Sequence, residues 1–480
     1  MSALSRGGLF ASFEDDREEV AAAEVVESAD NAEADLGAAQ DELNEAEEAT
    51  RVVEQASDDA DTLEEVADTL ESREESGGAT PEEIEMAEVT VESICNRLGI
   101  KKPVSLAAES FSSRSDRKRQ TQLAVEGIRE IGDTIWQTIL KIYRKIREWI
   151  MKAWDYFFDA RTKLLRRAKA LEAKVDKVEG TPKESVIQGS FIEGLAHKGG
   201  FPSFNELPKA VEQAEEGSSK FVLENTNSLK EQEEAFKKVV EAANKASESN
   251  PAGGVLVNNE FIPASMALVS VSLGTLARIL EDCDETTLSN GKKAYITKEF
   301  TLGNKLPGIT GITSDDKALI SKYKNGIAGF KGQIGKTDEA TNILEVIKKV
   351  KVQYVETTKR INKDFKAKVL TESEMSSIVS KCVNALEDFK DAEKNIKKFT
   401  DSMKIIESIA QSAGGSVTKK LDSDAKKAFS SAAKVNTKIT QVLSTAMSYF
   451  KKTTLELIRY QLDYVQKSLA QYKQDEDDED

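Results

Sequence analysis

The feature that most constrains the fold is a long run without helix breakers. Between residues 123 and 171 the sequence contains no proline and two glycines, Gly127 and Gly132. Apolar side chains recur through this run with a spacing near 3.6 residues, which is the repeat of one helix face. They are Ile128, Ile131, Ile135, Ile139, Ile142, Ile146, Trp149, Ile150, Ala153 and Phe157, and Trp136, Leu140, Tyr143, Trp154 and Phe158 widen the row. The run predicts one long helix in a mainly α fold of elongated bundle segments with disordered termini.

Histidine and cysteine are too rare for several kinds of site. The chain has 480 residues but a single histidine, His197, which makes a His-based metal site or nucleophile system improbable. Cys95, Cys283 and Cys382 lie far apart, so we expect reduced core thiols and no disulfide framework. We therefore expect no catalytic, cofactor or metal site, and we expect His197 to be exposed.

The chain start and the long apolar run bear on membrane association. The first residues carry one cation and then run into acids, without an apolar stretch of signal-peptide length. The apolar segment near residues 128–158 is broken by charges every three or four positions, which excludes a standard transmembrane helix there. The expected protein is soluble or peripheral.

Charge is divided unequally along the chain, whose formal net charge is −17. Residues 1–109 hold 31 acids and 7 bases, a net of −24, whereas residues 110–480 hold 60 bases and 53 acids, a net of +7. Residues 110–174 are the most basic stretch, and residues 475–480 are all acidic. Such asymmetry suggests a polyanionic partner for the basic part, covered by an acidic segment, although a merely solubilising acidic tail has the same signature.

The acidic segment predicts two helices. From about residue 41 it keeps a thin, alanine-rich apolar row, so the first helix needs a partner to be stable. The row is Leu43, Ala46, Val53, Ala56, Ala60, Leu63, Val66 and Leu70. After the Gly77-Gly78 pair, Thr80, Pro81 and Glu83 form a helix start with a capping box. The second helix should end at Gly99, and its apolar face is Ile84, Ala87, Val91, Ile94, Cys95 and Leu98.

A short polar stretch, residues 104–114, follows without periodicity and reads as a linker. The order of features from residue 77 to about 175 resembles the internal head proteins of phiKZ-like bacteriophages. The features are Gly77 to Pro81, the helix end Asn96-Arg-Leu-Gly99, the linker Ala107-Ala108-Glu109 before Ser110-Phe111, and the helix that contains Gly127 to Trp136. The resemblance implies a non-enzymatic virion protein inside the phage head, made in the host cytoplasm.

The resemblance also implies proteolytic maturation. In such proteins a prohead protease removes an N-terminal propeptide by cutting after the Glu of a small-x-Glu motif, which places the cut between Glu109 and Ser110, after Ala107 and Ala108. The motif recurs, at Ala22-Ala23-Glu24, Ala170-Leu171-Glu172, Ala246-Ser247-Glu248 and Ala385-Leu386-Glu387. Glu109 differs from these by lying in a linker, where proteolysis is favoured, at the boundary where the charge changes sign.

Cleavage there would convert an anion of −17 into a cation of +7. The freed basic helix would bind phosphate and gain affinity from released counterions. The expected partners are phage genomic DNA, bound without sequence preference, the prohead protease and other head proteins. The candidate contact residues are Lys141, Arg144, Lys145, Arg147, Lys152, Arg166, Arg167, Trp149 and Trp154.

Two other interpretations of the basic aromatic helix stay open. Its aromatic face can be plain bundle core with solvated charges opposite, which is compatible with DNA contact because the two use opposite faces. Lys and Arg on one face with Trp and Phe on the other are also typical of helices at a membrane surface. In that alternative the protein is a peripheral membrane-active or ejected effector.

The remaining sequence predicts further helices near 207–249, 262–283, 338–364, 372–411 and 422–472, with a small β-hairpin within 289–303. The expected organisation is an acidic helical propeptide (1–109), a basic Trp-rich helix (110–175), a linker (176–206), a helical domain (207–474) and an acidic tail (475–480). Gly335-Lys336-Thr337 resembles the end of a phosphate-binding loop, but the glycine required five residues earlier is Phe330. Nucleotide binding is therefore not expected.

Overall fold

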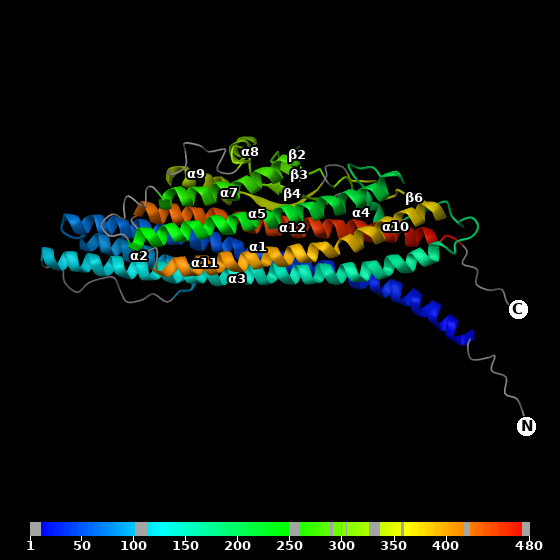
Figure 1. Cartoon of the computed structure of the whole chain (residues 1–480), viewed down its shortest axis with the longest axis horizontal. Helices are drawn as coiled ribbons and strands as arrows, with labels where there is room; N and C mark the ends of the chain where they lie inside the picture. Colours follow the sequence, from blue (N-terminus) through cyan, green and yellow to red (C-terminus); the bar gives the residue numbers. More distant parts are fainter. Residues whose placement is uncertain are drawn as a thin grey trace, which may run out of the picture.

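The computed structural model describes residues 11–100, 113–248, 260–288, 291–298, 300–303, 305–325, 337–356, 360–416 and 423–472, and shows an elongated bundle of long helices with a small sheet on one side (Figure 1). The mainly α prediction is confirmed. The helices are α1 (Ala11–Ser76), α2 (Pro81–Leu98), α3 (Arg114–Val175), α4 (Phe191–Leu195), α5 (Glu206–Glu248), α7 (Ile262–Glu281), α8 (Ser314–Ser321), α9 (Thr337–Lys348), α10 (Glu372–Asp388), α11 (Lys390–Ser416) and α12 (Ser423–Leu469). The strands are β1 (Val186–Ile187), β2 (Cys283–Thr287), β3 (Lys293–Thr297), β4 (Lys305–Thr310), β5 (Lys351–Glu356) and β6 (Ala367–Lys368).

The long basic helix is α3, and it is longer than the sequence run that predicts it. It starts after Ser113, whose side chain accepts a hydrogen bond from the backbone N–H of Asp116, as helix N-caps do. The predicted apolar row is largely buried: Ile128, Ile131, Ile135, Ile139, Ile146, Ile150, Ala153 and Phe157 are all no more than 4% exposed. The row therefore holds α3 in the bundle.

The predicted start and end of α2 are confirmed in detail. Thr80 accepts from the backbone N–H of Glu83, and the Glu83 carboxylate accepts from the backbone N–H of Thr80 at 2.9 Å. Gly99 ends the helix in the left-handed region, at φ 65°, where a side chain would be strained. Local signals alone fix this helix, so the sequence could place it.

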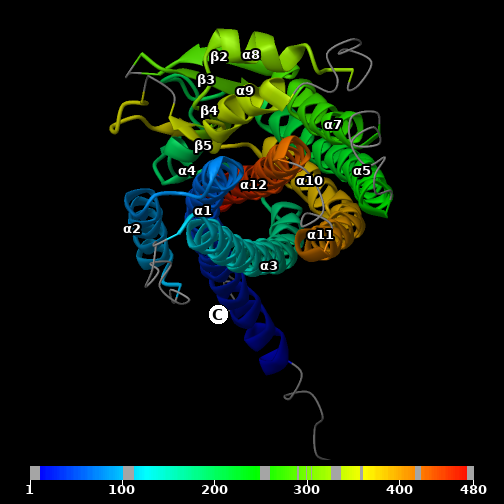
Figure 2. The ribbon, with the colours of Figure 1, turned by 90° about the vertical axis from the view of Figure 1, so that its left-hand side faces the viewer.

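Helix α12 lies at the centre of the assembly. It contacts α1, α3, α5, α7, α9 and α10 and the strands β4 and β5 (Figure 2). Its Lys451 is fully buried and pairs with Glu215 of α5 at 2.7 Å, and Ser219 lies 2.8 Å from the same ammonium. Burial lowers the pKa of Lys451, and the Glu215 carboxylate opposes that shift, so the charge is tolerated because it is paired.

The sheet is larger than the predicted hairpin. Of the range 289–303 predicted to hold a hairpin, the structure shows β3, which pairs with β2 before that range rather than with a strand inside it. Strands β4 and β5 complete a four-stranded antiparallel sheet in the order β2-β3-β4-β5. The prediction of one helix over 338–364 is wrong: α9 ends at Lys348, and residues 351–356 form β5. In β5, Val352 is buried in the main core, and Val355 is buried on the opposite face of the strand beside Gly308 of β4, while Lys351 and Gln353 are exposed. The two-stranded pair β1–β6 stands apart.

The segment expected to be a linker, 176–206, packs against the bundle. Phe191 of α4 is buried and stacks on Tyr464 of α12 with ring centroids 4.7 Å apart. His197 is half-buried rather than exposed, and its Nδ1 lies 3.3 Å from the carbonyl oxygen of Gly303. The predicted stretch 372–411 is divided at the buried Phe389, where α10 gives way to α11.

The most apolar helix is α7, which the sequence reasoning did not single out as a membrane candidate. Among the described residues it is the one helix long and apolar enough to cross a bilayer by length and composition. Of its most apolar window, 72% is buried inside the protein. Because a helix covered on most sides by its neighbours is typical of a protein core, α7 is read as a core helix.

Candidate functional site: an acidic helix on a basic body

Helix α1 runs antiparallel to α3 and is tied to it by ion pairs. Asp35 pairs with Lys163 at 2.6 Å, Glu42 with Lys152 at 3.6 Å and Glu71 with Arg129 at 2.6 Å. Two of these contacts lie in the first half of α1 and the third lies near its end. Opposite charges of α1 and α3 therefore meet in two separate regions of their contact.

Four more α1 carboxylates reach other elements of the basic part. On α12, Arg459 pairs with Glu33 at 2.5 Å, Lys438 with Glu54, and Lys434 with Asp61. On α9, Lys348 pairs with Asp58 at 2.7 Å. Burial lowers the pKa of Lys348, but its hydrogen bonds to Asp58 and Glu345 outweigh burial and raise it overall. We call the seven pairs between α1 and the elements after residue 109 the ionic seam.

The ionic seam flanks an apolar contact. The alanine-rich row of α1 lies in the main core, and each of its buried members is no more than 4% exposed. These are Ala32, Leu36, Ala39, Leu43, Ala46, Val53, Ala56, Leu63, Ala67 and Leu70. The partner that the thin row requires is therefore the Ile-rich face of α3 together with α12, and α1 is as much a part of the core as of the charge pattern.

The predicted DNA-contact residues fall into two groups. Lys141, Lys145 and Arg166 are exposed and form no ion pair among the described residues. Arg144 and Arg147 both pair with Glu407 of α11, so they tie two helices together. The structure therefore leaves only part of the predicted set free to contact a polyanion.

The other members of that set are covered or engaged. Trp154 is 1% exposed and packs edge-on against Phe157, and Trp149 is half-buried. Arg167 is 2% exposed and donates to Asp463 at 2.7 Å, so it does not face solvent as predicted. Lys152 is exposed but belongs to the ionic seam. Helical periodicity could not find these partners because they come from distant parts of the sequence.

The exposed face of α3 carries both signs of charge. Beside Lys145 and Lys152 it presents Glu148, Asp155 and Asp159. Burial raises the pKa of Asp155, and the nearby Asp159 carboxylate raises it further, which shows that like charges are close there. This face is therefore not a continuous basic stripe.

The start of α3 lies directly under the turn that joins α1 to α2. A Cβ on Gly78 would lie 2.5 Å from the carbonyl carbon of Arg117, so the two backbones are in close contact there. The next residue, Ala79, is fully buried and donates its backbone N–H to Thr121 Oγ1 at 2.8 Å. We call residues 77–79, seated on α3, the clasp.

The clasp contacts the backbone of a basic cluster that the sequence reasoning did not select. Arg114, Arg117, Lys118 and Arg119 lie within six residues, immediately after the predicted linker. Arg114, Lys118 and Arg119 are exposed, and Arg117 is half-buried. Their position next to the charge boundary was the signal that could have identified them.

The predicted cleavage residues Ala107, Ala108, Glu109 and Ser110 lie outside the described residues, as does Gly335-Lys336. The other four small-x-Glu copies end in helices: Glu24 in α1, Glu172 in α3, Glu248 in α5 and Glu387 in α10. Glu109 comes after the capped end of α2 and before the capped start of α3.

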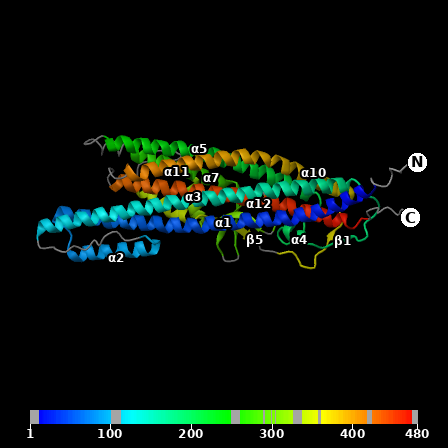
Figure 3. The same cartoon turned by 90° about the horizontal axis from the view of Figure 1, so that it is seen from below.

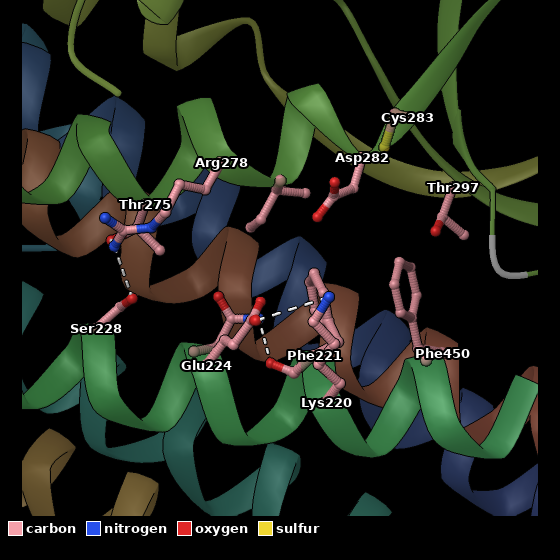
Figure 4. Close-up of a pocket in the computed structure, with 13 residues that line it drawn as sticks. Lys220, Phe221, Glu224, Ser228, Thr275, Arg278, Asp282, Cys283, Thr297 and Phe450 are labelled. Carbon is pink, nitrogen blue, oxygen red and sulfur yellow. Dashed lines mark hydrogen bonds and ion pairs between the residues drawn. The ribbon is translucent and has the colours of Figure 1, made fainter. Parts of the chain in front are cut away.

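A small pocket between α5, α7 and β2 offers no recognisable chemistry (Figure 4). Its volume of about 40 Å³ holds a water molecule rather than a substrate. Arg278 donates to Ser228 Oγ across it at 2.9 Å, and burial raises the pKa of the Cys283 thiol to about 12. Within the ranges the structure describes, no group of three His, Cys, Asp or Glu side chains is placed to hold a metal ion.

The geometry thus defines an elongated helical protein in which an anionic helix covers a cationic body. The sequence model of the phiKZ-like phage internal head proteins matches residues 38–474. The chain belongs to this family, and the protein is located inside the virion head. The match extends beyond residues 77–175 in both directions, so α1 and the C-terminal helices belong to the family pattern too. Neither the characterised proteins nor the solved structures contain a match.

Proposed function

We propose that this internal head protein is packaged with the genome and matured by removal of residues 1–109, the leader, after Glu109. Removal changes the formal net charge of the chain from −17 to +7. The ionic seam carries the proposal, because seven leader carboxylates occupy seven cations of the body. Leader removal would free these cations for DNA phosphates, with affinity supplied largely by counterion release.

A single cut does not by itself separate the leader from the body. The buried row of α1 and the ionic seam would hold a cleaved leader in place as a separate chain. Phosphates of densely packaged DNA compete for the same cations, which favours release inside a filling head. In this proposal cleavage allows the leader to leave, and DNA phosphates displace its carboxylates from the cations of the ionic seam.

The membrane-active alternative receives no support from the positions of the aromatic side chains. Trp154 and Phe157 are buried in the bundle, and Phe158 packs against Phe389 of the α10–α11 junction. Insertion into a bilayer would require α3 to leave its neighbours first. We also propose that the protein is not an enzyme, and the support for this is its membership of a family of internal head proteins.

The cleavage proposal is tested on phage particles. Mass spectrometry of purified heads should find the chain beginning at Ser110, with peptides from residues 1–109 strongly depleted. A phage carrying Glu109→Gln should retain the leader. Glu172→Gln, which alters a helical copy of the same motif, should be processed normally and serves as the control.

DNA retention tests the functional consequence. The processed chain from heads should bind duplex DNA at 50 mM salt, and for six to ten phosphate contacts its affinity should fall by about 10³-fold or more at 200 mM salt. The full-length chain should bind far more weakly at both. Equal binding by the two forms, or leader peptides as abundant in heads as the remainder, would overturn the proposal.

A further inference from the structure

We propose that the N-terminal part of α3, residues 114–129, is the DNA-backbone-binding element of the processed chain, and that the clasp holds it inactive before processing. We call this segment the basic arm. The inference rests on the proposed function, since it assigns the residues through which the processed chain meets DNA. It differs from the sequence prediction, which placed that contact on residues 141–167 of α3.

The basic arm concentrates cations next to the new chain start. Arg114, Arg117, Lys118, Arg119 and Arg129 fall within 16 residues, and the arm also contains the acids Asp116 and Glu126. Cutting after Glu109 would leave the first cation four residues from the new N-terminus, whose amino group adds another charge. No other described part of α3 has four bases in six residues.

The leader sets an acidic region against this arm. The last turns of α1 and the first turn of α2 carry Asp68, Glu71, Glu74, Glu82 and Glu83. Glu71 pairs with Arg129, while Arg73 pairs with Glu83 inside the leader. A polyanion that approaches the arm of the unprocessed chain therefore meets carboxylates of the same sign, which disfavours binding.

The clasp adds steric contact to this electrostatic cover. Gly77 has φ 121° and Gly78 φ 94°, and a Cβ on Gly78 would also lie 2.6 Å from the backbone nitrogen of Lys118. Only glycine permits this conformation and this approach at once. The buried hydrogen bond from Ala79 to Thr121 then fixes the turn on the first helical turns of the arm.

The arm has little support other than the leader. Figure 3 shows this end of α3 extending beyond the ends of α11 and α12, with α1 and α2 beside it among the described elements. Polar contacts of α3 with α12 and α11 occur further along the helix, where Tyr143 contacts Thr437 and Arg144 pairs with Glu407. Without the leader, the arm is therefore a solitary basic helix.

A solitary helix of this kind suits a polyphosphate partner. Isolated short helices are marginal in water, so the freed arm would exchange between helix and coil. Contact with phosphates neutralises its cations and offsets the free-energy cost of ordering the arm as a helix. A neutral partner would not neutralise these cations and so would not offset the cost of ordering the arm. We therefore assign the phosphate backbone of duplex DNA as the ligand.

Opening the clasp in the full-length chain tests its inhibitory part. Gly78→Ala should force the turn away from Arg117 and Lys118 and raise affinity for duplex DNA at 50 mM salt about tenfold or more without cleavage. Gly132→Ala is the matched control, because it makes the same substitution in α3 at a position where a Cβ meets nothing within 4 Å. Thr121→Val removes the acceptor for Ala79 together with the hydrogen bond that the same hydroxyl donates to the carbonyl oxygen of Arg117. It should give a smaller rise and guards against misfolding of the Gly78 variant. Unchanged affinity in both clasp variants would refute the inhibitory role.

Charge removal in the processed chain tests the arm itself. The triple variant Arg117→Gln, Lys118→Gln and Arg119→Gln should reduce the slope of log affinity against log salt by about 2.7, since each lost phosphate contact contributes about 0.9. The matched control replaces Lys394, Lys397 and Lys398 of α11 by Gln, which removes the same charge from another exposed surface. If the processed chain binds DNA and both triple variants lose affinity equally, the arm assignment is wrong while the proposed function stands. If the processed parent does not bind DNA, the proposed function itself fails.

Discussion

At the scale of single residues, local partners were predictable and distant ones were not. Thr80 and Glu83 cap α2 as their three-residue spacing predicts. Arg167 instead meets Asp463, 296 positions away, and nothing in the spacing of α3 indicates that carboxylate. Charged residues on a predicted helix therefore reveal their burial only when the neighbouring helix is known.

His197 offers a clean residue-scale test because it is the only histidine in the chain. Burial lowers its pKa, which the backbone contact to Gly303 only partly offsets. Its imidazole should therefore titrate below the ordinary value of 6.5 in an NMR experiment on the folded protein. Because the fold favours the neutral ring, this group adds stability above pH 6.5 that is lost as the pH falls through its lower folded pKa. A midpoint at or above 6.5 would contradict the half-buried placement.

At the scale of elements, periodicity identified the helices with their faces but not their limits. In the segment after α9, Val352 and Val355 are buried while Lys351 and Gln353 are exposed, and the three-residue spacing of the two valines is one that a helix face also shows. Pairing with β4 decides for a strand, and the paired residues of β4 lie 41 to 51 positions earlier. The thin apolar row of α1 likewise predicted an amphipathic helix, but the sequence did not indicate which elements cover that row.

The ionic seam makes an element-scale prediction for α1. Lys434 is only 10% exposed where it meets Asp61, so the pair should be worth more than a surface pair. A double-mutant cycle with Lys434→Met and Asp61→Asn, read by denaturant unfolding, should give a coupling of about 1 kcal/mol. The exposed pair Arg51–Glu47, within α1 itself, provides the comparison and should give about 0.3 kcal/mol. Equal couplings would mean that the seam contributes no more than ordinary surface charge.

At the scale of the whole molecule, the opposite charges of the two segments were visible in the sequence, but the depth of their contact was not. The composition shift at residue 109 suggests separable parts, whereas α1 lies along α3 and α12 with its apolar row buried. Segment charge is a sum over the sequence, while packing depends on which faces meet in space. The position at which the net charge changes sign is therefore not a boundary between separately packed parts of this protein.

This arrangement predicts how a cleaved chain behaves. If a specific protease site is placed between Glu109 and Ser110 and the purified chain is cut, the leader should stay bound during gel filtration at 0.1 M salt. Raising the salt to 1 M screens the exposed seam pairs but not the apolar contact, so release should become faster without being immediate. Prompt separation at 0.1 M salt would show that the buried row of α1 does not hold the leader.

Because α1 and α3 run antiparallel, one end of their contact lies at the clasp. This sets the order in which the two helices would separate. The predicted cut and the clasp adjoin the start of α3, while the pair between Glu33 of α1 and Arg459 of α12 lies toward the other end of the contact. Peeling would start where the leader is least supported and expose the cluster at Arg114 to Arg119 first. Loss of contact over a few helical turns at this end would then be enough for the protein to bind DNA, well before the remainder of the leader is lost.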